Sequence, residues 1–180
     1  MKRIALTGGI ACGKSLLSSF LEKEGIKVID ADEIVHRLIP EEQRKALAKK
    51  VFSDPKARRE LERRIHPLVK EEIDRFFAGG RDDEIRVAAI PLLFEVHWDE
   101  NFDIICCVVS SREKQIERMI TSRGYSRQEA ESRINAQMSV EEKALKSHYV
   151  INNDSTSVEL ESETRKFISW LKNSTCSRNR

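Results

Sequence analysis

Short apolar runs recur along the chain and predict strands that are buried on both sides. The first, Ile4–Leu6, ends at a pair of glycines, and the second, Lys27–Ile29, follows a helical stretch that stops near Gly25. The next two, residues 85–90 (IRVAAI) and 103–109 (DIICCVV), are too continuously apolar for strands with one face in water. Such strands, alternating with helical segments, predict an α/β fold with a parallel sheet covered on both faces.

A highly charged segment, residues 32–79, separates the second and third predicted strands and has mostly helical character. Proline lacks the N–H that a helix interior needs and restricts the residue before it. We therefore expect breaks at Pro40, at Pro55 and at the pair His66–Pro67.

The second half of the chain continues the alternation of strand and helix. Residues 112–146 form a long basic segment, which we expect to be two helices divided at Gly124. Tyr149–Ile151 predicts a last short strand, and Val158–Leu171 carries apolar residues at helical spacing. The polar tail, residues 173–180, is expected to fray.

Length and composition fit one compact domain. The 180 residues can bury a sizeable core without a disulfide or a metal, and 32 basic against 30 acidic residues leave a net charge of only +2. That balance gives no reason to expect nucleic acid or a membrane surface as a partner. The chain has no leader and no apolar run long enough to cross a bilayer, so we expect a cytoplasmic protein. Its oligomeric state is open, with a monomer favoured.

The four cysteines match no zinc or disulfide spacing and predict reduced thiols. They are Cys12, the neighbours Cys106 and Cys107, and Cys176. Cys12 is either a small, silent residue or a redox switch whose pKa is lowered by the start of a helix. The silent interpretation is favoured.

The stretch LTGGIACGKSLL, residues 6–17, carries the pattern G-x-x-x-x-G-K-[ST] on Gly8, Gly13, Lys14 and Ser15. A strand before it and a helix after it are the context that this pattern requires. The loop amides and the positive end of the helix would hold phosphate, and Lys14 would reach the β and γ phosphates. The Ser15 hydroxyl would bind Mg²⁺. Phosphate binding is the firmest functional prediction from the residues alone.

The chain lacks the N-K-x-D and D-x-x-G patterns of GTPases and the L-S-G-G-Q of ABC-type ATPases, which favours a P-loop kinase of small molecules. Asp30 and Asp32 follow the second predicted strand, at the edge where open α/β sheets bind ligands. Either carboxylate could accept a proton from an acceptor hydroxyl or hold Mg²⁺ through water. For Asp32 the structural alternative is an N-cap of a helix starting near Glu33.

The basic segment supplies four arginines, Arg118, Arg123, Arg127 and Arg133, close to Gln137. Forked guanidinium donors suit phosphate oxygens, and an arginine that closes over a transferring phosphoryl group can raise the rate by about 10³ to 10⁵. On an exposed helix an arginine is more often only solvated. The sequence therefore does not show which of the four arginines is essential for phosphoryl transfer.

Several motifs occur in a fixed order along the chain. They are LTGGIACGKS (6–15), VIDAD (28–32), LERRIHPLV (61–69), AIPLLFE (89–95), the arginine series with Gln137, and YVINN (149–153). Two of them, "HP" and "PLLFE", are not general features of P-loop proteins. With these motifs the chain resembles, nearly from end to end, the dephospho-coenzyme A kinase family, which catalyses the last step of coenzyme A synthesis.

The resemblance implies a three-layer P-loop kinase fold with a parallel five-stranded sheet in a single domain, residues 1–180. It also implies an inserted helical substrate part at about 33–80 and a helical lid at about 112–146. The cofactors would be ATP and Mg²⁺, the partner would be the small-molecule substrate dephospho-coenzyme A, and the reaction would phosphorylate its ribose 3′-hydroxyl.

The resemblance also implies roles for residues of the motifs. Asp32 would be the base for the acceptor hydroxyl, with Lys14 and the lid arginines Arg118, Arg123 and Arg133 assisting transfer. The ATP contacts would be Gly9, Ile10, Ala11, Cys12, Gly13, Lys14, Ser15, Leu16 and Asn153, the Mg²⁺ ligand would be Ser15, and the acceptor side would include Asp32, His66, Pro67, Leu92, Leu93 and Glu95.

The chain departs from the family pattern in a few places. About two dozen residues that members usually carry between the helix ending near Leu38 and the helix beginning near Arg44 are missing. Ala11-Cys12 replaces the usual Gly-Ser of the loop, and Ser147-His148 replaces a common Ala-Asp. Asp154-Ser155 stands where family members often have a glycine after Asn153. Two alternatives stay open: a nucleoside or nucleotide kinase, and a nucleotide-binding regulator that transfers nothing.

Overall fold

The computed structural model describes residues 2–39, 55–81 and 84–176. A five-stranded sheet with strand order β2-β3-β1-β4-β5 forms its centre, and every pair of neighbouring strands is parallel. The sequence predicted all five strands to within one or two residues. They are β1 (Arg3–Gly8), β2 (Lys27–Asp30), β3 (Arg86–Ala89), β4 (Ile104–Val109) and β5 (Tyr149–Asn152).

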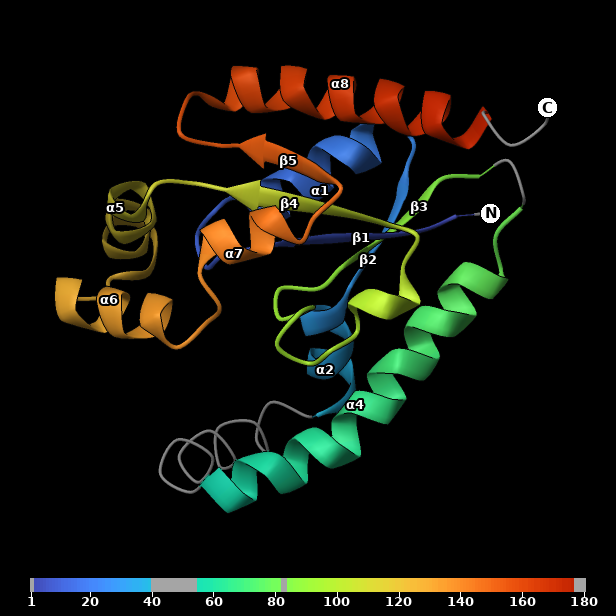
Figure 1. Cartoon of the computed structure of the whole chain (residues 1–180). Helices are drawn as coiled ribbons and strands as arrows, with labels where there is room; N and C mark the ends of the chain where they lie inside the picture. Colours follow the sequence, from blue (N-terminus) through green and yellow to red (C-terminus); the bar gives the residue numbers. More distant parts are fainter. Residues whose placement is uncertain (1, 40–54, 82–83, 177–180) are drawn as a thin grey trace.

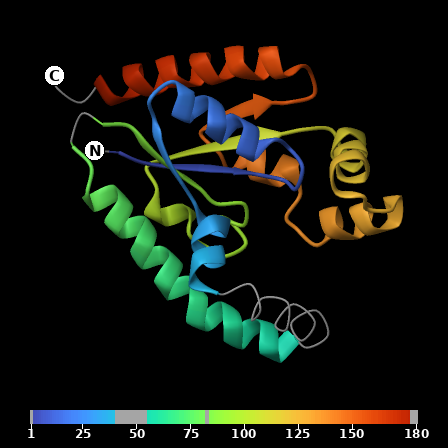
Figure 2. The ribbon, with the colours of Figure 1, turned by 180° about the vertical axis from the view of Figure 1, so that it is seen from behind.

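Helices cover both faces of the sheet, giving three layers (Figure 1, Figure 2). One face carries α1 (Lys14–Lys23) and α8 (Ser157–Cys176), which pack side by side. The other face carries α2 (Ala31–Leu38), α4 (Pro55–Ala78), the short 3₁₀ helix η1 (Asp99–Asn101) and α7 (Val140–Leu145). The pair α5 (Arg112–Arg123) and α6 (Arg127–Asn135) lies beyond the carboxyl end of β4 (Figure 1).

Alternation along β1 divides the core between the two faces. Ile4 and Leu6 belong to the cluster with α1 and α8, whereas Ala5 belongs to the cluster with α2 and α4. Burial of both faces is what the continuous apolar runs predicted. Cys106 and Cys107 lie in β4 and are fully buried.

Two expected helix boundaries were wrong. Helix α4 runs through Pro67 without a break. Proline removes one hydrogen bond, but the buried row Val69, Ile73 and Phe77 at four-residue spacing packs the rest of the helix onto the sheet. The closing helix α8 continues to Cys176, so residues 173–176 are helical and not frayed.

The basic segment was also wrong in helix number, because it forms three helices and not two. Gly124 does end α5, in the left-handed conformation. A second break follows α6, so α7 is the additional helix. Both α6 and α7 begin with a capping box, Ser126 with Glu129 and Ser139 with Glu142. The repeated S-x-x-E pattern was a signal in the sequence for these two starts.

Helix α4 begins at Pro55, so a helix boundary lies at this proline, as expected. Other expectations lie outside the described residues: the break at Pro40, the helix beginning near Arg44 and the last residues of the tail, 177–180. Within the described part of the chain, none of the helices combines the length and the apolar character needed to cross a membrane.

Candidate active site

The glycine loop between β1 and α1 contains residues in the left-handed backbone conformation, which favours glycine. Gly13, the N-cap of α1, has a φ of 95°, and a Cβ there would lie 2.1 Å from Asn153 Nδ2. Ala11 also adopts a left-handed φ, 58°, at the position where the family usually has glycine. The loop therefore turns sharply into the start of α1, where helix amides point outward and favour an anion.

Lys14 and Asp30 join the loop to the second strand. Lys14 Nζ lies 3.0 Å from Asp30 Oδ2, and both side chains are largely shielded from solvent. Asp30 Oδ1 accepts from the backbone N–H of Asp32 and caps α2, which begins at Ala31. The N-cap alternative for Asp32 was therefore wrong, because Asp30 holds that position.

Asp32 lies in the first turn of α2 and does not cap the helix. Its side chain is open to solvent, but it lies in the wall of a cavity where surrounding protein replaces part of the bulk water. This partial desolvation raises the pKa of the carboxyl, against the opposing effect of nearby Lys14, while Asp30 raises it further. A carboxylate that ionises reluctantly beside a phosphate-binding loop suits proton transfer.

A cavity of about 380 Å³ is lined by the glycine loop, Asp32 and two of the four arginines. Most of the residues that the sequence predicted for phosphate binding lie in its wall. The lining residues are Gly9, Ile10, Ala11, Gly13, Lys14, Ser15, Asp32, Pro91, Arg118, Ser122, Arg123 and Gln137. The cavity is thus lined by polar backbone and cations at the carboxyl ends of the strands.

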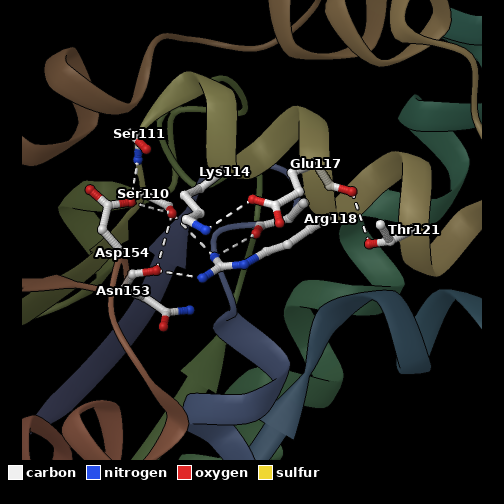
Figure 3. Close-up of polar contacts among 9 residues, drawn as sticks. Ser110, Ser111, Lys114, Glu117, Arg118, Thr121, Asn153 and Asp154 are labelled. Carbon is white, nitrogen blue, oxygen red and sulfur yellow. Dashed lines mark hydrogen bonds and ion pairs between the residues drawn. The ribbon is translucent and has the colours of Figure 1, made fainter.

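Arg118 is fixed by hydrogen bonds to three parts of the chain (Figure 3). Its guanidinium donates to Ala11 O of the loop, to Ser110 Oγ and to Asn153 O after β5. Asn153 in turn donates from Nδ2 to Cys12 O. Arg118 and Asn153 therefore brace the glycine loop from behind, and this bracing role was not predicted from the sequence.

The other arginines differ in position. Arg123 lines the cavity with Lys14 and Asp32. Arg133 lies over the ring of Tyr125, with 4.4 Å from its Cζ to the ring centroid, and Arg127 pairs with Glu113 and Glu131. In this conformation only Arg118 and Arg123 of the four reach the cavity wall.

A second, mostly apolar cavity of about 130 Å³ adjoins the first. His66 and Leu92, two of the predicted acceptor residues, line it, and Trp98 meets His66 edge to face at 5.5 Å between ring centroids. Leu93 is buried in the core, whereas Pro67 lies on the exposed side of α4. Asp32 and Pro91 line both cavities, so Asp32 stands where the two meet.

A family model described as dephospho-CoA kinase matches residues 2–43 and 41–159. The chain belongs to the dephospho-CoA kinase family. The match divides at residues 41–43, which is where the missing part of the insert was expected. Family membership, with the parallel five-stranded sheet, confirms the expected P-loop kinase fold.

Individual relatives support the same assignment. The dephospho-CoA kinase of Symbiobacterium thermophilum is 40% identical over 179 residues, which cover 85% of this chain and 74% of the relative. A solved Thermus thermophilus protein has a TM-score of 0.80 at 29% identity and covers 94% of this chain and 97% of its own. The dephospho-CoA kinase from Campylobacter jejuni, at 24% identity, supports the fold alone, with a TM-score of 0.73 and coverage of 96% and 98%.

A buried ion pair in this family member was missed by sequence reasoning. Lys143 of α7 is fully buried, and its Nζ lies 2.8 Å from Glu95 Oε1 and 2.7 Å from Pro91 O. The same Glu95 oxygen accepts from Met138 N. Glu95, predicted for the acceptor side, thus links the turn after β3 to α7. The sequence gave no indication of this ion pair, because Lys143 is one lysine among many basic residues.

Replacing Lys143 with Met should destabilise the protein by about 2 to 4 kcal/mol. Removing one partner of a buried pair costs about 3 to 5 kcal/mol, and Glu95 keeps enough exposure to reduce that figure. Urea unfolding measures the change. Adding Glu95→Gln to Lys143→Met removes the stranded charge and should recover part of the loss; an undiminished loss in the double variant would contradict the ion-pair explanation.

Cys12 should resist thiol reagents in the folded protein. It is fully buried, and burial raises its pKa to about 11, so fewer than about one thiol in 10³ is ionised at pH 7.5. This supports the silent interpretation. Iodoacetamide labelling followed by peptide mapping should modify Cys12 only after denaturation, and rapid labelling of the native protein would restore the redox-switch alternative.

Proposed function

We propose that this chain transfers the γ-phosphoryl group of ATP to the ribose 3′-hydroxyl of dephospho-coenzyme A, giving coenzyme A. Its family and its P-loop support ATP as the phosphate donor. The observation that carries the proposal is Asp32, which lies in the walls of both the phosphate cavity and the apolar cavity. A hydroxyl bound there would sit between a base and a phosphate.

The loop side of the cavity would hold the triphosphate. The amides near Gly13 and the ammonium of Lys14 would offset the phosphate charge before transfer begins. The Ser15 hydroxyl lines the same cavity and is the hard oxygen ligand that Mg²⁺ takes beside phosphate oxygens. Bound there, the ion would screen charge between the β and γ phosphates.

The acceptor side would be formed by the apolar cavity and the elements around it. His66, Leu92 and Trp98 offer flat or apolar surface within the same wall as Asp32. Asp32 would orient the hydroxyl and accept its proton, and positioning supplies most of the acceleration because the transition state is loose. In this scheme residues 33–80 form the substrate part and residues 112–146 the lid, with Arg123 closest to the transferring group.

A panel of acceptors tests the assignment of substrate. With ATP and Mg²⁺, dephospho-coenzyme A should support turnover at least 100-fold better, by kcat/KM, than adenosine or nucleoside monophosphates. Phosphorus NMR of the product should show the new phosphate on the 3′ position. Preference for a nucleoside or its monophosphate would favour the alternative kinase, and nucleotide binding without transfer to any acceptor would favour the regulator.

A further inference from the structure

Two glutamines hold the peptide groups of Ile10, the third residue of the glycine motif. Gln115 Nε2 donates to Ile10 O at 2.7 Å, and Ile10 N donates to Gln137 Oε1 at 3.0 Å. Gln115 lies on α5 and is only 2% exposed. Gln137 lies in the connection between α6 and α7. One loop residue is thus clamped by two segments more than 100 positions away in the sequence.

The two contacts are chemically different. Gln115 satisfies a carbonyl oxygen, which repels phosphate, and its bond can persist when nucleotide binds. Gln137 satisfies an amide N–H, which is the group that a P-loop offers to phosphate oxygens. Phosphate and the Gln137 amide therefore compete for the same donor.

The position of this donor favours the terminal phosphate as the competitor. Ile10 and Gln137 line the 380 Å³ cavity together with Lys14 and Asp32. The phosphate that is transferred must lie between the cation that binds it and the carboxylate that faces the acceptor. A diphosphate lacks that group and would leave the bond between Ile10 and Gln137 intact.

Gln137 is also connected to the rest of the predicted lid. A third cavity, of about 360 Å³, is lined by residues of α5, α6 and α7 and also by Ile10 and Gln137. Gln137 therefore lies in the walls of both this cavity and the 380 Å³ cavity. Its neighbour Met138 donates from its backbone N–H to Glu95, and Ser139 caps α7. Release of Gln137 would loosen the 136–139 connection at one point while both of its ends remain attached.

We propose that Gln137 is a positioning residue whose hydrogen bond from the Ile10 N–H is replaced, when nucleotide binds, by one from the same N–H to the terminal phosphate. The exchange couples the presence of a triphosphate, but not a diphosphate, to the connection between α6 and α7. The inference rests on the proposed use of ATP at this site, and it is independent of the identity of the acceptor.

Replacing Gln137 with Met keeps the length of the side chain and removes the competing oxygen. The affinity for a non-hydrolysable ATP analogue should rise about two- to tenfold, because a hydrogen bond worth about 0.5 to 1.5 kcal/mol no longer has to be broken. The affinity for ADP should change less than twofold. Gln128→Met, at an exposed position of α6, is the matched control and should alter neither affinity.

Calorimetry without any acceptor gives these affinities. Equal changes for both nucleotides, or weaker binding of the triphosphate by the Met variant, would overturn the proposal. Hydrogen exchange of the unmodified protein gives a second test: the ATP analogue should increase exchange in residues 136–139 relative to ADP, and identical exchange would also overturn it. Absence of acceptor turnover with this selective response intact would instead count against the proposed reaction alone.

Discussion

Asp32→Asn should lower the acceptor-dependent kcat by a factor of about 10² to 10³ while ATP binding stays within about twofold. Asn keeps the shape of the side chain but cannot accept a proton, and general-base catalysis typically contributes 10² to 10⁴. The lower part of that range is expected because little proton has moved in a loose transition state. Steady-state kinetics and calorimetry separate the two effects.

The same variant should not lose stability. Partial desolvation in the cavity wall raises the pKa of Asp32 in the folded state, so the folded protein holds more protons than the unfolded chain between the ordinary pKa and the raised one. Stability contributed by this group therefore falls as the pH rises through that window, and at neutral pH the ionised form is mildly destabilising. Asn removes that cost, and the melting temperature at pH 7 should be unchanged or slightly higher.

Glu33→Gln is the matched control for this experiment. Glu33 is the next residue of α2, is exposed, and carries the same functional group. Its replacement should leave kcat within twofold. Full activity of Asp32→Asn, or an equal loss in Glu33→Gln, would remove Asp32 from the mechanism.

Lys14→Met should produce the second large loss, about 10² to 10³ in kcat together with weaker ATP binding. The ammonium is a preorganised charge in the wall of the phosphate cavity, and removing one such group typically costs that much. The substitution also strands Asp30, whose carboxylate lies 3.0 Å from Lys14 and would then repel the nucleotide.

A double variant separates these two contributions. Lys14→Met with Asp30→Asn removes the stranded charge and keeps an N-cap side chain for α2, so ATP affinity should partly recover while kcat stays low. Lys23→Met, on the exposed face of the same helix, should behave like the parent protein. Recovery of kcat in the double variant would show that Lys14 acts only by neutralising Asp30.

The parts of the structure that were predictable are those set by local patterns. Continuous apolar runs gave the five buried strands, and the spacing from Gly8 to Ser15 gave the phosphate loop, because strand burial and loop geometry each depend on nearby residues. The two S-x-x-E capping boxes were equally local and were overlooked. Local patterns in the sequence therefore placed the glycine loop between β1 and α1.

The parts that were not predictable depend on contacts between distant segments. Arg118 reads as a lid arginine, yet its bonds to Ala11, Ser110 and Asn153 make it a brace for the loop. Lys143 and Gln137 likewise gain their roles from distant partners, Pro91 at 52 positions and Ile10 at 127 positions. No periodicity or motif records such pairings, since they follow from the strand order of the sheet.

The measurement that tests the central claim most directly is ADP formation by the purified protein with ATP and Mg²⁺, with and without dephospho-coenzyme A. The proposed reaction predicts that ADP forms in proportion to added acceptor, one ADP for each coenzyme A, and that Asp32→Asn suppresses this signal. ADP formation that is independent of dephospho-coenzyme A, or none in its presence, would contradict the proposed function.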